Sequence, residues 1–186
     1  VSLSGVANTD PNVFLTAGIN QIAFEAITDV AIPLLALEIA PGRGFVDVYE
    51  AESAQNILAG TAIVIDDPTA SGGKYVGGIG NGVANFLEFK DILVTQSGLY
   101  RMVVHFANAE FRGGHSYNSQ VVDLSAHIRV NDNSTQRVYF RNTFAWDNYQ
   151  TRVVDVMLET GRNTIRFFII DPDEYAPRID KIEIAA

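Results

Sequence analysis

The chain of 186 residues is acidic, with 22 aspartate and glutamate residues, 13 lysine and arginine residues and a net charge of -9. This balance disfavours a nucleic-acid-binding protein, which needs a basic surface, and no basic stripe is visible in the sequence. Hydrophobic residues make up 47% of the chain, which is enough for a core. The length favours one domain of sandwich or barrel size, with room for an additional segment.

The chain contains no cysteine, which excludes disulfides, thiolate chemistry and cysteine-ligated zinc. No apolar run reaches the length of about 18 residues that a membrane span needs, so we expect no membrane association. The chain begins with VSLSG and lacks a basic segment followed by an apolar one. We therefore expect that any secretion signal has been removed or lies upstream, and that the protein is extracellular.

Short runs rich in Val, Ile, Phe and Tyr recur along the chain, separated by Gly, Asn, Asp and Pro. This pattern is typical of β-strands joined by turns. We predict strands near residues 20–27, 34–39, 45–50, 61–66, 85–94, 99–108, 121–131, 135–142, 151–159, 163–171 and 178–185. Residues 51–59 alone indicate a short helix. Many short strands without helical periodicity predict an antiparallel β-sandwich.

Residues 13–24 (VFLTAGINQIAF) are similar to residues 156–167 (VMLETGRNTIRF), and each segment is followed by a proline and a closing strand. Two β-hairpins that share the same turn chemistry would explain the similarity. Alternatively, residues 1–46 are the end of a preceding β-sandwich, or a segment that packs onto the main domain at residues 47–186. The sequence PGRG at residues 41–44 is then the joint between them.

Sequence templates for enzymes are absent. There is no G-x-S-x-G elbow and no H-E-x-x-H pair, and the glycine-rich residues 72–82 lack the spacing of a phosphate-binding loop. We interpret these glycines as turns between strands. His105 and His127 lie in predicted strands and have structural roles in this interpretation, whereas His115 lies in a loop and could face a ligand.

Glu50 and Glu52 lie on the same side of the chain if residues 49–52 are extended, because side chains alternate along a strand. Two carboxylates that point the same way repel each other unless a cation or an arginine lies between them. Calcium, which takes six to eight oxygen ligands, would relieve that repulsion. The alternative is that both side chains face solvent.

A series of short segments, taken in order, resembles carbohydrate-binding modules of families 6 and 35, and family 35 in particular. The segments are YEAE (49–52), ASGGKYVG (70–77), NFLEF (85–89), SGLYRM (97–102), FANAE (106–110), IRVN (128–131), FAWDNY (144–149), GRNTI (161–165) and APRIDKIEI (176–184). The resemblance covers about residues 47–186, and it rests on the ordered set because no single motif is diagnostic. Residues 1–46 lie outside it.

The resemblance implies a jelly-roll β-sandwich that binds sugar without catalysis and contains a structural Ca²⁺. The ligands that it implies are Glu50, Glu52 and Asp180, with backbone oxygens near Ser71 to Lys74. Asp180 enters this set only through the resemblance, because its position in the terminal strand does not by itself bring it near the glutamates.

The resemblance also implies a sugar site in loops at one end of the sandwich. Aromatic rings would pack on the C–H face of a pyranose, and planar polar side chains would bond to its hydroxyls. The candidates are Trp146, Tyr149, Asn148, Asp147, Tyr75, Asp171 and Tyr175, with His115, Tyr117 and Asn118 in an insertion that is longer than the family's. Trp146 has polar neighbours in RNTFAWDNYQT, and the alternative to sugar contact is that its ring fills the core. Tyr75 is equally compatible with a role in the core and a role in the sugar site. Residues 171–175 depart from the family, which commonly offers an asparagine there.

The leading hypothesis is a monomeric sugar-binding module of a larger secreted enzyme, which holds the attached catalytic domain near polysaccharide. A second hypothesis is a calcium-stabilised spacer that packs on a catalytic domain without binding sugar. A third is a hydrolase that uses Glu50 and Glu52 as an acid/base pair, although a metal site explains this pair better. Uronic acids, mannans, galactosides and α-glucans all remain open as ligands. A uronate would need an arginine such as Arg112 or Arg141, or a second cation.

Overall fold

The computed structural model describes residues 46–113 and 121–185. The chain divides into two units, Val1–Phe45 and Val46–Ala186, and the second unit contains all the described residues. The predicted strands at 20–27 and 34–39, the first copy of the internal similarity and the predicted joint at 41–44 lie outside the described residues. The assignment of residues 1–46 therefore stays a prediction.

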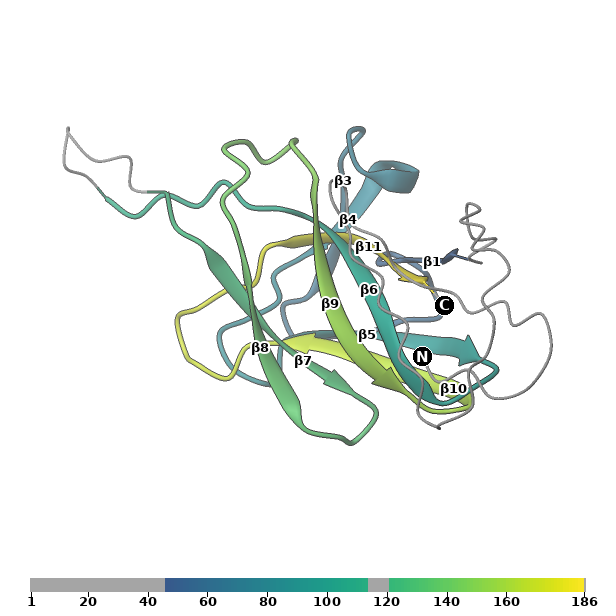
Figure 1. The fold of residues 1–186 in the computed structure, drawn as a ribbon. Coiled ribbons are helices and arrows are strands. Elements are labelled where there is room, and N and C mark those ends of the chain that lie inside the picture. The colour runs from purple at the N-terminus through teal and green to yellow at the C-terminus, as the bar shows by residue number, and fades with distance from the viewer. Residues whose placement is uncertain (1–45, 114–120, 186) are drawn as a thin grey trace, which may run out of the picture. The chain divides into compact units, whose positions relative to one another are not determined.

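Eleven strands and one short 3-10 helix make up the described part of the chain (Figure 1). The strands are β1 (Val46–Glu50), β2 (Ile57–Ala59), β3 (Ile63–Asp66), β4 (Lys74–Gly77), β5 (Phe86–Val94), β6 (Gly98–Ala107), β7 (Leu124–Val130), β8 (Thr135–Phe140), β9 (Gln150–Leu158), β10 (Gly161–Phe168) and β11 (Arg178–Ala185), and the 3-10 helix is η1 (Ser71–Gly73). No helix in the described ranges is long and apolar enough to cross a membrane.

The strands form two antiparallel sheets that pack face to face, so the predicted β-sandwich is confirmed (Figure 1). The six-stranded sheet has the order β3-β4-β11-β6-β9, with β1 also paired to β11, and the five-stranded sheet has the order β2-β5-β10-β7-β8. The last strand of the chain is thus central in its sheet, where it joins β1, β4 and β6. This position brings the sequence around Asp180 beside the sequence around Glu50.

The core lies between the two sheets and follows from the alternation along each strand. In β9 and β10 every second side chain is buried over most of the strand, for example Val154, Val156 and Leu158. Phe106 of β6 packs edge to face against Phe140 of β8 across the interface between the sheets, with ring centroids 4.9 Å apart. Phe89 of β5 and Phe167 of β10 form a second edge-to-face pair, at 5.7 Å, within the five-stranded sheet.

The prediction of a short helix at residues 51–59 is wrong, because this segment is a turn that leads into strand β2. The Asn56 side chain sets the turn: its Nδ2 donates to the carbonyls of Glu50 at 2.9 Å and Ala51 at 3.0 Å. Its Oδ1 accepts from the Lys90 N–H in β5 at 3.2 Å. The asparagine thus satisfies backbone groups that a helix would otherwise pair.

The glycine-rich residues 72–82 contain a strand as well as turns. Gly72 and Gly73 have φ of +62° and +77°, a backbone conformation that glycine adopts without strain. Strand β4 follows immediately and pairs with β3 and β11. The turns agree with the interpretation of the sequence, whereas the strand within the run was missed.

Candidate functional site

Glu50 and Asp180 meet where β1 pairs with β11. The register places Glu50 opposite Lys181, and the N–H of Ala51 donates to the Asp180 carbonyl at 2.9 Å. Ser71 joins them from η1: its N–H donates to Asp180 Oδ1 at 2.9 Å and its hydroxyl to Glu50 Oε1 at 2.8 Å. Three segments that are remote in sequence therefore converge on two carboxylates.

The Glu52 carboxylate lies against Gly72, next to the residue whose hydroxyl and N–H bond to Glu50 and Asp180. A β-carbon at position 72 would lie only 2.6 Å from Glu52 Oε1, so the carboxylate occupies the space that any side chain there would fill. The second oxygens of both glutamates, Glu50 Oε2 and Glu52 Oε2, are buried and have no hydrogen-bond donor. Buried acceptors without a partner are costly, and two on adjacent acids point to a missing positive group. We refer to Glu50, Glu52 and Asp180 as the carboxylate cluster.

The pKa values of two carboxyl groups in the carboxylate cluster are raised, chiefly by burial and further by the neighbouring negative charges. Burial, together with the charges of Glu50 and Glu52, raises the pKa of Asp180 to about 6, although the Ser71 N–H and Lys181 oppose the shift. Burial also raises the pKa of Glu52, and the charge of Glu50 adds to this effect. The folded chain therefore holds more negative charge here than its own cations offset.

The oxygens of Glu50, Glu52, Asp180 and Ser71 are of the chemical type that a hard cation such as calcium prefers. Among the described residues, no group of three or more histidine, aspartate or glutamate side chains is arranged to hold a metal by itself. Hydroxyl or backbone oxygens from the turn at Ser71 would have to complete the set. Lys74 can contribute only its carbonyl oxygen, because its ammonium group is a cation without a lone pair; that group lies 4.0 Å from the exposed Asp66 carboxylate.

A second group of polar and aromatic residues surrounds Arg178, at the start of β11. Its guanidinium carbon lies 4.5 Å from the centroid of the Tyr75 ring and 4.7 Å from that of Trp146, so two rings flank the cation. Arg178 NH1 donates to the Trp146 carbonyl at 3.2 Å and to Asp67 Oδ2 at 3.3 Å. We call Asp67, Tyr75, Trp146, Tyr149 and Arg178 the arginine cluster.

Asp67 completes the charge balance of the arginine cluster. It accepts hydrogen bonds from the N–H and hydroxyl of Thr69 at 3.0 and 2.6 Å, and from the Tyr149 hydroxyl at 3.1 Å. The Thr69 hydroxyl is the main reason that the pKa of Asp67 is lowered, and Tyr149 and Arg178 add to the effect. Burial, followed by the bond to Asp67, raises the pKa of Tyr149. Every charge in this cluster thus has a partner.

The loop that carries Trp146 is held by its own amide and hydroxyl groups. The Asn148 side chain donates to the Thr143 carbonyl at 2.7 Å, so this predicted sugar ligand shapes the loop. The Thr143 hydroxyl lies in turn 3.0 Å from the Asn108 carbonyl. Asp147 is exposed beside Trp146.

Comparisons with known proteins identify the fold family. A solved family 35 carbohydrate-binding module from Clostridium thermocellum is 49% identical, with a TM-score of 0.69; the match covers 75% of this chain and 98% of that module. The chain belongs to family 35 of the carbohydrate-binding modules. No family model matches the sequence. The predicted recognition is therefore confirmed by structural similarity together with high identity.

Other similar proteins are enzymes of which this chain matches only a part. An exo-β-1,3-galactanase from Phanerochaete chrysosporium, solved with galactose, shares the fold over 78% of this chain and 30% of its own, at 22% identity and a TM-score of 0.63. A 3-O-α-D-galactosyl-α-L-arabinofuranosidase from Bifidobacterium longum subsp. longum is 30% identical over 87% of this chain. The chain spans only 17% of that enzyme's length. This match is longer than the unit Val46–Ala186, so it extends into the residues before Val46.

Two predicted sugar ligands of this family 35 module lie beside Arg137 of β8. Asp171 Oδ2 is 3.6 Å from Arg137 NH1, while Arg137 NH2 donates to Glu174 Oε2 at 2.8 Å. Tyr175 is 46% exposed and helps to line a hollow of about 190 Å³ next to Arg137. No hydrogen bond or ion pair between described residues joins these side chains to the arginine cluster. The predicted sugar-binding residues therefore fall into two groups, one around Arg178 and one beside Arg137. His115, Tyr117 and Asn118 lie outside the described residues.

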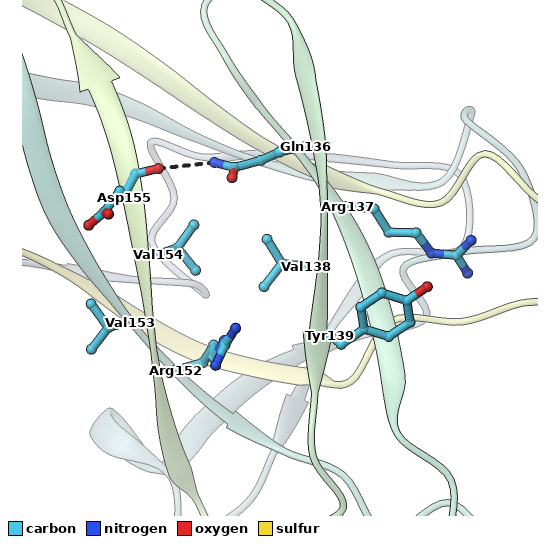
Figure 2. A pocket seen from close by; sticks show the side chains of 8 residues that line it. All are labelled: Gln136, Arg137, Val138, Tyr139, Arg152, Val153, Val154 and Asp155. Atoms are coloured by element: carbon cyan, nitrogen blue, oxygen red, sulfur yellow. Dashed lines mark hydrogen bonds between the residues drawn. The ribbon is translucent and has the colours of Figure 1, made fainter.

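The open side of the sandwich, between the edge strands β8 and β9, contains a hollow of about 300 Å³ but no predicted site residue (Figure 2). Val138 and Val154 face each other across it, and Gln136 Nε2 donates to the Asp155 carbonyl at 3.1 Å (Figure 2). Arg137 and Tyr139 lie on the other side of β8 and border both hollows.

Sequence reasoning missed Arg178 and Asp67 as members of a site. It named Arg112 and Arg141 as the arginines for an acidic sugar, but the arginine that stacks on Trp146 is Arg178. The only available signal was its place two residues before Asp180 in the last strand. Asp67 gave no signal, because its contact with Arg178 spans 111 positions in sequence.

Proposed function

We propose that this module binds saccharide without catalysis and so holds an attached glycoside-active domain close to its substrate. The observation that carries the proposal is the fixed Trp146 ring at a loop end of a family 35 sandwich. The ring is partly exposed, and Arg178 covers one of its faces. A sugar would therefore pack on the other face of Trp146.

The ligand class that we propose is a polysaccharide containing galactose or arabinose. The support comes from the names of the relatives: a galactosyl-arabinofuranosidase at 30% identity and an arabinopyranosyl-arabinofuranosidase from Bifidobacterium pseudocatenulatum at 38% identity over 63 residues. A module in such an enzyme gains effective concentration when it binds the polymer that the catalytic domain cleaves. The parent protein would then be secreted, with this unit acting as a monomer.

We also propose a structural calcium ion on Glu50, Glu52 and Asp180, completed by oxygens of the turn from Ser71 to Lys74. The buried, unpaired glutamate oxygens and the raised pKa of Asp180 support it. When bound, the ion supplies the positive charge that the carboxylate cluster lacks. The chain's own contribution is to cross-link β1, the turn at Ser71 and β11.

Affinity electrophoresis on a panel of polysaccharides tests the saccharide proposal. The panel contains arabinogalactan, galactan, mannan, an α-glucan and polygalacturonate, and we expect arabinogalactan or galactan to retard the module. Trp146→Ala should weaken that retardation about tenfold or more, because it removes the stacking face. Leu99→Ala, which removes a 67% exposed side chain from strand β6, is the matched control and should bind as wild type does.

Equal binding by Trp146→Ala and wild type would contradict the site. Absence of binding across the whole panel would instead favour the second hypothesis, a calcium-stabilised spacer. The carboxylate cluster is common to both hypotheses, so calcium binding does not distinguish them.

A further inference from the structure

Phe144 presents its ring to solvent from a backbone conformation that bulky residues avoid. Its side chain is 70% exposed, although it is a large hydrophobic residue two positions before Trp146. Its φ is +66°, in the left-handed region, where a β-carbon is disfavoured. The backbone strain costs stability, and packing of the ring in the core does not offset it.

A buried polar network holds Phe144 in this conformation. Its N–H donates to Asn142 Oδ1 at 2.8 Å, and Asn142 Nδ2 donates to the Glu110 carbonyl at 2.8 Å. The next anchor is Thr143, which is fully buried and whose hydroxyl lies 2.9 Å from the Ala145 carbonyl. The loop therefore fixes the ring in its exposed position.

The Trp146 ring, in the same loop, is packed against another side chain, whereas the Phe144 ring is exposed. One face of the Trp146 ring is covered by Arg178, and the Trp146 carbonyl accepts a hydrogen bond from the same guanidinium. The loop thus offers one docked aromatic ring and one free ring, two residues apart. Strained conformations that the surroundings enforce occur preferentially at binding and active sites.

We propose that Phe144 is a saccharide-contacting platform for the sugar unit next to the one that packs on Trp146. The inference rests on the proposed function and deepens it, because it makes the ligand an oligosaccharide of at least two units. A phenyl ring has no hydrogen-bonding group, so it contacts only the C–H face of a sugar. Phe144 should therefore add affinity for chains and not for single sugars.

Calorimetric titration with galactose, β-1,3-galactotriose and soluble arabinogalactan tests this proposal. Phe144→Ala should weaken binding of the trisaccharide and the polysaccharide about tenfold and leave galactose binding unchanged. Leu99→Ala should match wild type for all three ligands. If arabinogalactan is not the polymer that the panel identifies, the polymer that wild type retains replaces it.

Phe144→Gly gives a readout that a merely structural ring would not produce. Glycine relieves the left-handed strain, so Tm should rise by about 2–4 °C while trisaccharide binding falls as in Phe144→Ala. A fall in Tm would overturn the proposal, because it would show that the ring stabilises the fold. Wild-type trisaccharide affinity in both Phe144 variants would also overturn it.

The two sites fail in distinguishable ways. If only Trp146→Ala loses binding, the proposed function stands and the role of Phe144 falls. If only the Phe144 variants lose binding, Trp146 is a structural residue docked on Arg178, and the proposal of two adjacent sugar units on Trp146 and Phe144 falls. Wild type that binds no member of the panel overturns both.

Discussion

The carboxylate cluster and the arginine cluster are both built on strand β11, yet they differ in electrostatic balance. Residues 67–73 reach both: Asp67 bonds to Arg178, and Ser71 bonds to Asp180 and Glu50. In the carboxylate cluster, two buried glutamate oxygens have no donor and the pKa of Asp180 is raised to about 6. In the arginine cluster, the pKa of Asp67 is lowered and its oxygens accept several hydrogen bonds.

This difference distinguishes a cluster whose charges are not balanced by the chain from one whose charges are. Buried acceptors without donors carry the cost of desolvation, and the calcium ion that we propose would offset it at the carboxylate cluster. The arginine cluster supplies its own cation, so its aromatic rings are positioned by the chain itself for the sugar binding that we propose. A pre-organised site of that kind loses less entropy on binding.

The largest expected effect is that of calcium on the carboxylate cluster. At a calcium concentration about a thousand times Kd, binding stabilises the fold by about 4 kcal/mol, which corresponds to a rise in Tm of about 10 °C. Differential scanning calorimetry with calcium and with chelator measures it. A Tm that is the same in both conditions would contradict a structural site here.

Glu52→Gln sharpens the same test, because it removes one of the repelling charges. We expect the variant to be more stable than wild type in chelator and to be stabilised less by calcium. Wild type should therefore be the more stable protein in calcium, and the variant the more stable one in chelator. Asp66→Asn removes a 90% exposed carboxylate near Lys74 and serves as the control, with a calcium response equal to that of wild type. Equal destabilisation of Glu52→Gln with and without calcium would mean that Glu52 is not a ligand.

The next effect is that of removing the cation from the arginine cluster. Arg178→Ala leaves Asp67 without its charge partner and uncovers two rings, so we expect a loss of about 1–3 kcal/mol in the free energy of unfolding. Arg178→Lys should recover little of it, because an ammonium cannot lie flat between two rings. Urea unfolding followed by the fluorescence of Trp146, the only tryptophan in the chain, measures both variants.

The calcium response of Arg178→Ala tests whether the clusters are independent. We expect the calcium-induced rise in Tm to be the same as in wild type, because no hydrogen bond or ion pair among the described residues joins Arg178 to Glu50, Glu52 or Asp180. A response that disappears with Arg178 would show that residues 67–73 couple the two clusters.

Most strand positions could be predicted from the sequence, because side-chain alternation is a local property. The reason given for pairing Glu50 with Glu52 was wrong, because β1 ends at Glu50 and Glu52 lies in the turn that follows. The pairing of β1 with β11 could not be predicted, since it joins residues at opposite ends of the module, and Asp180 was reached only through the family resemblance. Arg178 and Asp67 were missed for the same reason. The turn at Asn56 was read as a helix because composition does not show that one side chain bonds to two carbonyls and to β5.

A smaller effect is expected from substitution of Gly72, whose backbone lies against the Glu52 carboxylate. Gly72→Ala puts a β-carbon against Glu52 Oε1 at a φ of +62°, so we expect a loss of about 1 kcal/mol in stability and a weaker calcium response. Gly73→Ala is the matched control: its φ is +77°, but no atom lies within 4 Å of the added carbon. Chelator and calcium melting curves of both variants separate the strain, which they share, from the displacement of Glu52. Identical calcium responses would show that Glu52 does not need its place over Gly72.

The smallest effect is the acid dependence of the arginine cluster. Because the folded-state pKa of Asp67 is lowered, the unfolded chain binds its proton more readily. The contribution of Asp67 to stability is therefore complete above the unfolded pKa of about 3.9 and is lost as pH falls through the folded-state value. Asp67→Asn should remove this part of the acid dependence, so the difference in unfolding free energy between wild type and variant should shrink below pH 4. A difference that stays constant from pH 6 to pH 2.5 would mean that Asp67 acts through its shape and hydrogen bonds, and that the pairing of its charge with Arg178 adds nothing to stability.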